Sequence, residues 1–434
     1  MTDFIAIFLS LTLFIVLAFR GHDLLLSAIG CCCFMFLLSG QDPLEGLTEQ
    51  FLPGLAGFIQ DYLLLFLFSA LLGRLMSDGG SAKRIALALA GLICRRQKAR
   101  RFFSMLLVAT LYFVLCYVGI TGFVVIFTVL PIARDLFERT DTPWRFYCCG
   151  GAQSIAATFL VGSLQAGNVY ATDVCGTTLN ASPLLSLVAF GTFQAVFLLL
   201  LRIAARDVDR SGEGFLPSGT GILAAEVDKG VAEDRLPSLP MSLLPAAVVL
   251  LLAAGFGLPV VPVLCLGCLL TVVTCWSNLR PILKSSLSKG VMSSTGPVLG
   301  VAATYAIGIS IRSMEGYSFF EVLLSALPDL AQGCGLGLLS SFIMASAIAP
   351  IPAFGNQMLE HFTAAGLSAE ASHRMMTVTA FTSIAPHNAG ITNAATVLRL
   401  PYSKCLKMYL LFTYIPGVCT LLTSCLAIVL GIVK

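Results

Sequence analysis

The stretch SIAPHNAGITN at residues 383–393 interrupts an apolar part of the chain with a proline, a histidine and two asparagines. A second interruption, QAGNVYATD at residues 165–173, begins half a chain length earlier in a chain of 434 residues. Two more, YVGITG at 117–122 and APIPAFGNQ at 349–357, separate paired apolar segments in matching positions. Because unsatisfied backbone is costly inside a bilayer, symmetric helix breaks predict a binding site between two repeats.

The composition around these stretches indicates a membrane protein. Hydrophobic residues make up 57% of the chain and charged residues 11%, with a mean hydropathy of +0.91. Soluble domains carry about 25% charged residues, and many apolar runs here approach the roughly 20 residues that span a bilayer. A cytosolic enzyme and a disordered protein are therefore excluded, and the net charge of +3 is too small to indicate a nucleic-acid partner. The first run, 4–19, is expected to be a retained span.

Cysteine usage does not point to a metal or redox site. The chain has 15 cysteines, and many lie inside apolar runs, where cysteine behaves as a small apolar residue. Cys265 and Cys268 have C-x-x-C spacing but no histidine nearby. We therefore expect no cofactor and no structural metal.

Lysines and arginines assign the sides of the membrane, because basic residues concentrate in cytoplasmic loops. This rule places both termini outside. It places segment 205–241 inside, and the charged residues, glycines and prolines of this segment indicate a linker. The linker separates an N-terminal repeat, 1–204, from a C-terminal repeat, 242–434. An odd number of spans in each repeat gives the two repeats opposite orientations.

The predicted fold class is therefore an all-α polytopic membrane protein with two inverted repeats, each with about five spans, an interfacial helix and a hairpin. The first repeat is expected to contain a cytoplasmic interfacial helix at 82–95, a hairpin at 102–137 and a broken span at 146–182. The second is expected to contain a hairpin at 333–364 and a broken span at 374–400. Charge leaves open whether each hairpin is re-entrant or two full spans, since both return to the same side.

The interruptions supply the candidate binding residues. A broken helix directs free N–H groups and its positive dipole end toward one point, which suits an anion, while opposing carbonyls suit a cation. No lysine or arginine lies within the breaks, so neutral groups must hold a carboxylate. The candidates for substrate binding are Thr121, Gly122, Asn168, Thr172, Asn356, His387, Asn388, Thr392 and Asn393.

Two titratable residues are candidates for carrying the coupling ion. Asp173 is an acid within a membrane segment, and such residues are functional candidates by default. His387 has a side chain that titrates near neutrality. For each residue a solvated or structural role remains the alternative. Arg312 and Arg374 are expected to be boundary charges near the outer side.

Several segments resemble the gluconate:H⁺ symporter (GntP-type) permease family. The run FLPGLAGFIQDYLLLFLFSALLGRLMSDGGSAKRIA at 51–86 resembles the opening of that family, including its glycine-rich signature. Residues 118–134, ending in LPIAR, resemble a second region, and Pro386-His387-Asn388 resembles a proline–histidine–asparagine loop. The resemblance covers most of the chain. Two departures, the absence of prolines at 165–168 and Ala389 in place of a glycine, bear on the substrate.

The resemblance implies a wider superfamily of ion-coupled anion carriers, with paired re-entrant hairpins, homodimers and alternating access of elevator type. We therefore expect a secondary active transporter and not an enzyme: a symporter, multi-pass in the bacterial cytoplasmic (inner) membrane. Its expected substrate is a small organic anion such as gluconate or a related sugar or hydroxy acid, coupled to H⁺. Its expected partners are that anion, the lipid bilayer and a second copy of the chain.

Three other classes were weighed. A Na⁺-coupled di- or tricarboxylate carrier of the same superfamily is the alternative within transport. A membrane-embedded enzyme is disfavoured because the sequence has no HExxH, G-x-S-x-G or P-loop motif and no paired carboxylates in its spans. A channel is disfavoured because the two halves are not identical and no repeated ring of charge occurs.

Overall fold

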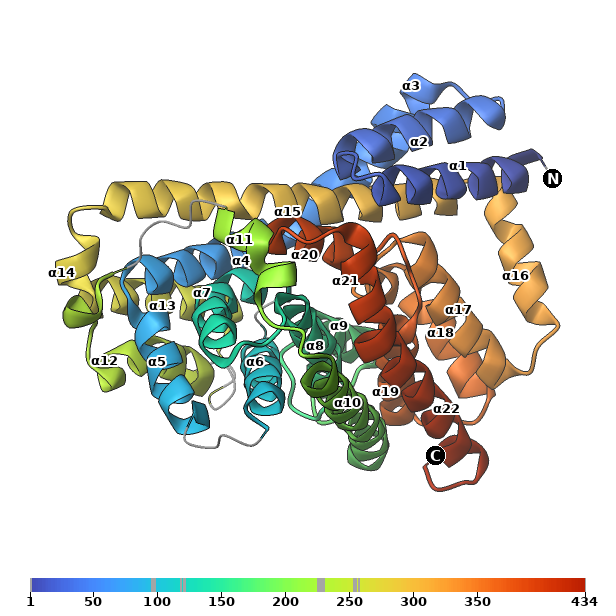
Figure 1. Ribbon diagram of the computed structural model, residues 1–434. Helices are drawn as coiled ribbons and strands as arrows, with labels where there is room; N and C mark the ends of the chain where they lie inside the picture. The colour runs from blue at the N-terminus through green and yellow to red at the C-terminus, as the bar shows by residue number, and fades with distance from the viewer. Residues whose placement is uncertain are drawn as a thin grey trace.

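The computed structural model is a bundle of helices, along the upper side of which the long helix α15 (Leu283–Arg312) runs in the view of Figure 1. It describes residues 2–94, 99–117, 119, 122–224, 231–252, 256 and 258–433. These residues form no β-strand. Five helical stretches among them are long and apolar enough to cross a bilayer: Pro43–Asp78, Arg100–Tyr117, Pro183–Ser211, Leu283–Arg312 and Tyr402–Val429. The predicted class, an all-α polytopic membrane protein, is confirmed.

The first half of the chain forms the helices up to residue 211. They are α1 (Thr2–Phe19), α2 (Leu24–Leu38), α3 (Pro43–Gly46), the π-helical turn η1 (Leu47–Phe51), α4 (Leu52–Asp78), α5 (Ser81–Cys94), α6 (Arg100–Tyr117), α7 (Gly122–Thr140), the 3₁₀ turn η2 (Trp144–Cys148), α8 (Cys149–Phe159), α9 (Ala166–Cys175) and α10 (Pro183–Ser211).

The second half begins with two short elements, α11 (Leu216–Ala224) and η3 (Glu233–Arg235). It continues with α12 (Leu239–Leu250), α13 (Val260–Thr274), α14 (Trp276–Leu279), α15 (Leu283–Arg312), η5 (Glu315–Tyr317), α16 (Ser318–Ser325), α17 (Asp329–Ile343), α18 (Pro350–Ala364), α19 (Ala369–Thr382), α20 (Ala389–Leu398), α21 (Tyr402–Tyr409), the π-helical turn η6 (Leu410–Tyr414) and α22 (Ile415–Val429).

The order of elements in the first half recurs in the second. A helical pair (α1–α2, α12–α13) is followed by a long helix (α4, α15), a short helix (α5, α16), a second pair (α6–α7, α17–α18), an interrupted helix (α8–α9, α19–α20) and a final long helix (α10, α21–α22). The two halves also exchange contacts, because α2 packs on α15 and α13 packs on α4.

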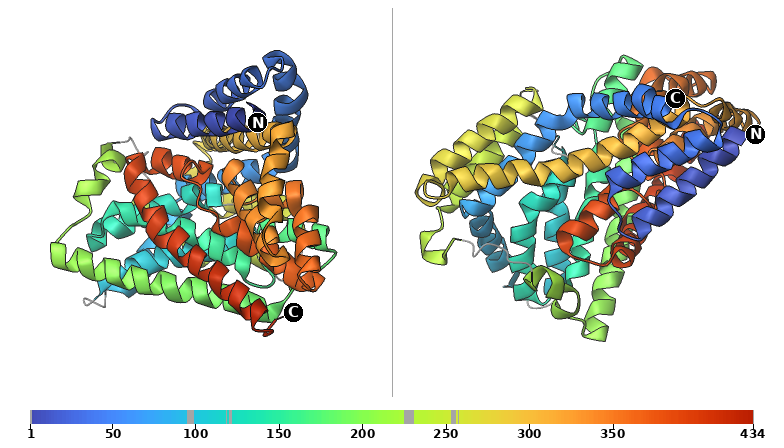
Figure 2. Two further views of the ribbon diagram at one scale, coloured as in Figure 1. Left: turned by 90° about the vertical axis from the view of Figure 1, so that its right-hand side faces the viewer. Right: turned by 90° about the horizontal axis from the view of Figure 1, so that it is seen from above.

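The long helices α4 and α15 lie side by side and run antiparallel (Figure 2). Gly54, near the start of α4, lies against Ile309 near the end of α15. At the other end, the Ser286 hydroxyl donates to the Asp78 carboxylate at 2.6 Å. Because α4 and α15 hold equivalent places in their halves, this packing relates the halves by opposite orientation.

Ion pairs connect several of the segments that are rich in basic residues. Arg101 pairs with Asp141 at 2.8 Å, and Arg145 pairs with Glu213 at 2.6 Å. These contacts join the ends of α6, α7 and α10. The start of α1 lies next to the end of α15, where Asp3 contacts Gly316. The side of the membrane on which each end lies stays a prediction.

Helix boundaries differ from the expected segments mainly in the linker. Helix α10 continues to Ser211, and α11, η3 and the start of α12 occupy part of 205–241. The extension follows from packing, because Ala205 and Val208 are buried against the bundle. Residues 225–230, and 95–98 beside the expected interfacial helix, lie outside the described residues.

Both hairpins turn back beside an interrupted helix. The Leu164 amide donates to the Tyr117 carbonyl at 2.9 Å, which places the end of α6 next to the second interruption. Gly119 lies there with φ of +92°, and a Cβ on it would come within 2.9 Å of the Leu164 carbonyl oxygen. In the second half the Ser383 hydroxyl donates to the Leu338 carbonyl at 2.8 Å. Both halves therefore place a hairpin beside the interrupted helix, and whether each hairpin is re-entrant stays a prediction.

Candidate functional site

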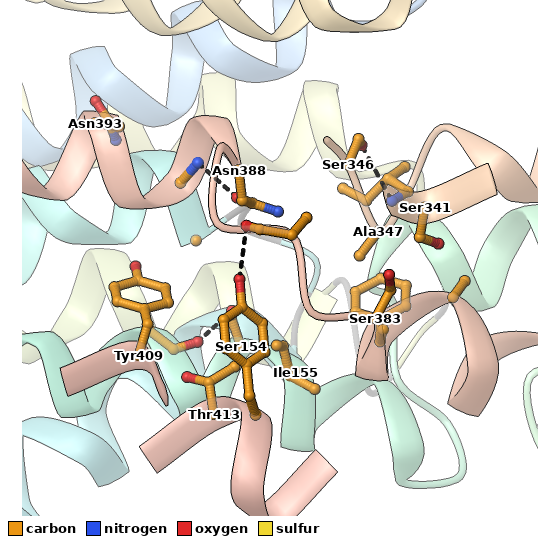
Figure 3. A pocket seen from close by; sticks show the side chains of 18 of the residues that line it. Ser154, Ile155, Ser341, Ser346, Ala347, Ser383, Asn388, Asn393, Tyr409 and Thr413 are labelled. Atoms are coloured by element: carbon orange, nitrogen blue, oxygen red, sulfur yellow. Dashed lines mark hydrogen bonds between the residues drawn. The ribbon is translucent and has the colours of Figure 1, made fainter. Parts of the chain in front are cut away.

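A cavity of about 120 Å³ lies beside the interruptions (Figure 3). Residues of the first, second and fourth interruptions line it, whereas at the third the lining residues, 346–348, come just before the stretch 349–357. Asn388 projects from the fourth interruption, with Ser341, Ser346 and Ser383 on one side of the cavity and Tyr409 on the other. The lining residues with polar side chains are Ser154, Gln165, Ser341, Ser346, Ser383, Asn388, Asn393, Tyr112, Tyr409, Thr413 and Tyr414. Apolar side chains such as Ile126, Ile155 and Phe381 complete the wall.

Four helix N-termini converge on this cavity. Gly122 begins α7, Gln165 precedes α9, Ile348 lies just before α18, and Asn388 caps α20. The first N–H groups of a helix lack partners within the helix, and its N-terminus carries about half a positive charge. The convergence therefore creates an environment that favours an anion.

The C-terminal ends of two helices also reach the cavity. Ser341 lies in the last turn of α17, and Phe381 lies in the last turn of α19. Carbonyl groups at these ends offer acceptors opposite the N–H groups. A ligand with both a carboxylate and a hydroxyl group matches this distribution.

Three buried donors in the lining have no hydrogen-bond partner among the described residues: Gln165 Nε2, Ser341 Oγ and Thr413 Oγ1. Buried polar groups in folded proteins are nearly always paired. Thr413 belongs to the π-helical turn η6, and such turns re-aim side chains at functional sites. The three unpaired donors are available to a bound molecule.

The fourth interruption is held firmly by its own hydrogen bonds. Asn388 Oδ1 accepts from the Gly390 amide at 2.7 Å, which caps α20. The hydroxyl of Tyr414 donates to the Ala385 carbonyl at 2.9 Å, and Tyr402 donates to the Pro386 carbonyl. The loop is therefore pre-organised, so a ligand need not order it.

None of the described lining residues carries a charged side chain. The described residues also include no group of three or more His, Cys, Asp or Glu side chains that could hold a metal ion. Charge at the cavity therefore comes from helix ends and from more distant groups.

The structure brings three of the predicted residues to the cavity: Gly122, Asn388 and Asn393. Thr121 and the side chain of Thr392 lie outside the described residues. That the three lining residues bind a substrate stays a prediction.

Other predicted residues lie away from the lining. His387 is buried between Phe14 and Phe342, with ring centroids at 5.9 and 5.1 Å, and its nitrogens have no partner in the described structure. Asn356 is exposed on α18. Asp173 is likewise exposed, on α9.

Thr172 and Asn168 are engaged in hydrogen bonds within the protein. The Thr172 hydroxyl donates to the Val169 carbonyl of its own helix at 2.5 Å. Asn168 is fully buried, and its amide donates to the Ser163 carbonyl at 2.8 Å. Its carbonyl oxygen accepts from His373 Nε2 at 2.8 Å and from Arg374 at 3.2 Å. These bonds leave Asn168 no free group for a ligand.

Arg374 is not a boundary charge, and that expectation was wrong. Its side chain is fully buried on α19. It donates to the carbonyls of Thr158 at 2.9 Å and Ala181 at 3.2 Å, and to Asn168. No carboxylate among the described residues forms an ion pair with it. Its position at the edge of an apolar segment suggested exposure, but the loops on both sides of α9 close over it.

His373 completes this buried group and is neutral there. Its Nε2 faces the Asn168 carbonyl oxygen, so it carries the proton, while Nδ1 accepts from the Thr177 hydroxyl at 2.7 Å. A second proton on the ring would place a positive charge in a buried position beside the Arg374 guanidinium. Arg312, in contrast, is exposed, donates to the Ala353 carbonyl at 2.6 Å and lies over the Phe354 ring.

Sequence reasoning missed several lining residues. Ser341, Tyr409 and Thr413 lie within helices that read as apolar, so no break or motif marked them. The only available signal was a polar side chain inside a membrane segment. Gln165 was part of a predicted interruption, but it was not singled out.

Comparison with known proteins gives one similar chain over nearly the full length. The uncharacterized transporter YxjC of Bacillus subtilis (strain 168) is 25% identical over 453 aligned residues, covering 93% of this chain and 94% of the relative. The solved structure of the YdaH transporter of Alcanivorax borkumensis, described as having an unusual topology, aligns at 14% identity over 87% of this chain and 88% of that one. Its TM-score of 0.46 is too low to carry an argument. No protein-family model matches the chain, so the resemblance to the gluconate:H⁺ symporter family stays a prediction.

Proposed function

We propose that the protein is a secondary active transporter that carries a small organic anion, and that the cavity between the four helix N-termini is its substrate site. The observation that carries the proposal is the convergence of four helix N-termini on a cavity lined by uncharged residues. Similarity to a bacterial transporter over nearly the whole chain supports the class. The candidate substrates are hydroxy acids and sugar acids, the broad class that includes gluconate.

The binding energy available at the cavity suits a substrate that must also leave. A helix end contributes roughly 0.3–1 kcal/mol to binding an anion, and up to about 2 kcal/mol when partly buried. Three unpaired donors add about 1 kcal/mol each on forming hydrogen bonds. Together these contributions approach the roughly 8 kcal/mol that corresponds to micromolar affinity. A transporter needs affinity of this order and not tighter.

We further propose H⁺ as the coupling ion, with His387 or Asp173 as its carrier. His387 adjoins Asn388 in the same loop, and its ring nitrogens are unpaired among the described residues, so a proton there would alter the loop that lines the cavity. Alternating access of elevator type and a homodimer belong to the same proposal. A Na⁺-coupled di- or tricarboxylate carrier is the alternative.

Uptake into proteoliposomes tests the proposal. Purified protein is reconstituted, and accumulation of radiolabelled lactate, gluconate and succinate is measured under an imposed pH gradient, an imposed Na⁺ gradient or neither. We expect accumulation of an organic acid only under the pH gradient. Accumulation under the Na⁺ gradient alone would show that the coupling ion is Na⁺ and not H⁺. The absence of uptake in every condition would reject the transporter proposal.

Two matched variants locate the site. Thr413→Val removes an unpaired hydroxyl from the lining and should raise the apparent KM roughly fivefold, which corresponds to about 1 kcal/mol. Ser372→Ala removes a buried hydroxyl that is also unpaired in the described structure but does not line the cavity, so it should leave the KM unchanged. Equal changes of KM in both variants would show that the substrate does not bind in this cavity.

A further inference from the structure

We infer that, within the class of organic anions, the cavity selects compact monocarboxylates with a hydroxyl or keto group, and discriminates against dicarboxylates and six-carbon sugar acids. This inference rests on the proposed function and narrows its substrate. Three observations carry it: the volume of the cavity, the balance of helix ends around it and its unpaired donors.

The volume of the cavity matches a short ligand. The cavity measures about 120 Å³, somewhat less than the roughly 150 Å³ of an engineered cavity that holds benzene. A hydroxy acid of three or four carbons has about as many non-hydrogen atoms as benzene, whereas a six-carbon sugar acid has about twice as many. The smaller acid fits without rearrangement of the wall.

The wall resists expansion because part of it is backbone in close contact. A Cβ on Gly151 would lie 2.7 Å from the Tyr409 hydroxyl oxygen, so α8 and the end of α21 already touch across this corner. A Cβ on Gly122 would lie 3.1 Å from the Ser154 Cβ. Extra room on these sides requires movement of whole helices, which protein interiors resist.

The helix ends set the charge of the ligand. Four N-termini contribute about half a positive charge each, and the C-termini of α17 and α19 contribute about half a negative charge each. The balance is roughly one positive charge, which compensates one carboxylate. A second carboxylate would be buried with no charged lining residue to pair it, and burial of an unpaired charge is strongly unfavourable.

The unpaired donors favour a ligand with a second polar group. Gln165 Nε2, Ser341 Oγ and Thr413 Oγ1 belong to three different elements that border the cavity. A simple fatty acid would leave them unpaired, whereas a hydroxyl or keto oxygen can accept from them. Binding of a hydroxy acid therefore satisfies both the helix ends and these donors.

Calorimetric titration of the purified full-length protein in lipid nanodiscs tests the inference. The probes are lactate, glycerate, propionate, succinate, gluconate and the neutral amide lactamide. We expect lactate or glycerate to bind at least about tenfold more tightly than each of the other four. Succinate or gluconate binding as tightly as lactate would overturn the inference while leaving the proposed function intact. No binding of any carboxylate would instead reject the proposed function.

A pair of isosteric truncations tests the size limit. Ile155→Ala shortens a side chain that lines the cavity and therefore enlarges the cavity. Ile391→Ala is the control, because it removes the same atoms from a fully buried position outside the lining. We expect Ile155→Ala to lower the ratio of lactate affinity to gluconate affinity about tenfold or more. Ile391→Ala should leave this ratio unchanged. An unchanged ratio in both folded variants would show that this wall does not limit ligand size.

Discussion

Replacement of Arg374 by methionine should destabilise the protein by about 3 kcal/mol. The guanidinium donates at 2.9 Å to Thr158, and at 3.2 Å to both Ala181 and Asn168. Three hydrogen bonds from a charged group amount to roughly 5–9 kcal/mol. Removal of a buried, unpaired charge returns several kcal/mol of desolvation energy, which leaves the smaller net loss. The three acceptors lie at the end of α8, in α9 and in the loop after α9. The loss of stability should therefore loosen the packing of α9 and its neighbouring loops.

The measurement is denaturant unfolding in mixed micelles, followed by the fluorescence of the two tryptophans. Trp144 is fully buried and donates to the Leu398 carbonyl at 3.0 Å, so its emission reports on the interior. Arg312→Met is the matched control, because Arg312 also donates to a carbonyl but is exposed. It should cost less than about 1 kcal/mol. Equal unfolding midpoints for Arg374→Met and the unmodified protein would refute the reasoning.

Three more results are expected from single substitutions. The Phe215 amide, with help from Arg101, holds the pKa of Asp141 below its usual range. Its stabilisation is therefore present above about pH 4 and lost as the pH falls through the lower folded value, so Asp141→Asn should flatten the acid limb of a stability–pH profile. Thr220→Cys, on a background without the 15 native cysteines, should resist an impermeant maleimide in intact cells, and labelling there would overturn the assigned sides. Asp173→Asn should abolish uphill accumulation but preserve exchange if Asp173 carries the proton, whereas normal pH-driven uptake would remove it from the mechanism.

The sequence alone determined the class and the general plan of the molecule. Hydropathy is a local property, so it identified the apolar helices of a membrane protein. Helix breaks are also local, because proline and glycine act on their own backbone. The fourth stretch, 383–393, contains the break between α19 and α20, which covers 383–388. The second stretch was placed too late, because residues 166–173 form most of α9 and the break after α8 covers 160–165.

Only the tertiary structure decided which side chains reach the cavity. His387 and Asn388 are adjacent in one loop, yet Asn388 lines the cavity whereas His387 packs between Phe14 and Phe342. The sequence predicted both as ligands because both are polar. Their directions depend on aromatic neighbours that lie hundreds or tens of residues away, and no local pattern encodes those neighbours.

The same reason explains the residues that were placed wrongly or missed. Asn168 has the chemistry of a ligand, but Arg374 and His373 from the other half of the chain use its carbonyl oxygen. Thr413 lies in an apolar segment, and it borders the cavity only because η6 packs against the interruptions. Composition and local backbone preference fix where helices form and break. The long-range packing of the two halves fixes which of their polar atoms remain unpaired and face the cavity.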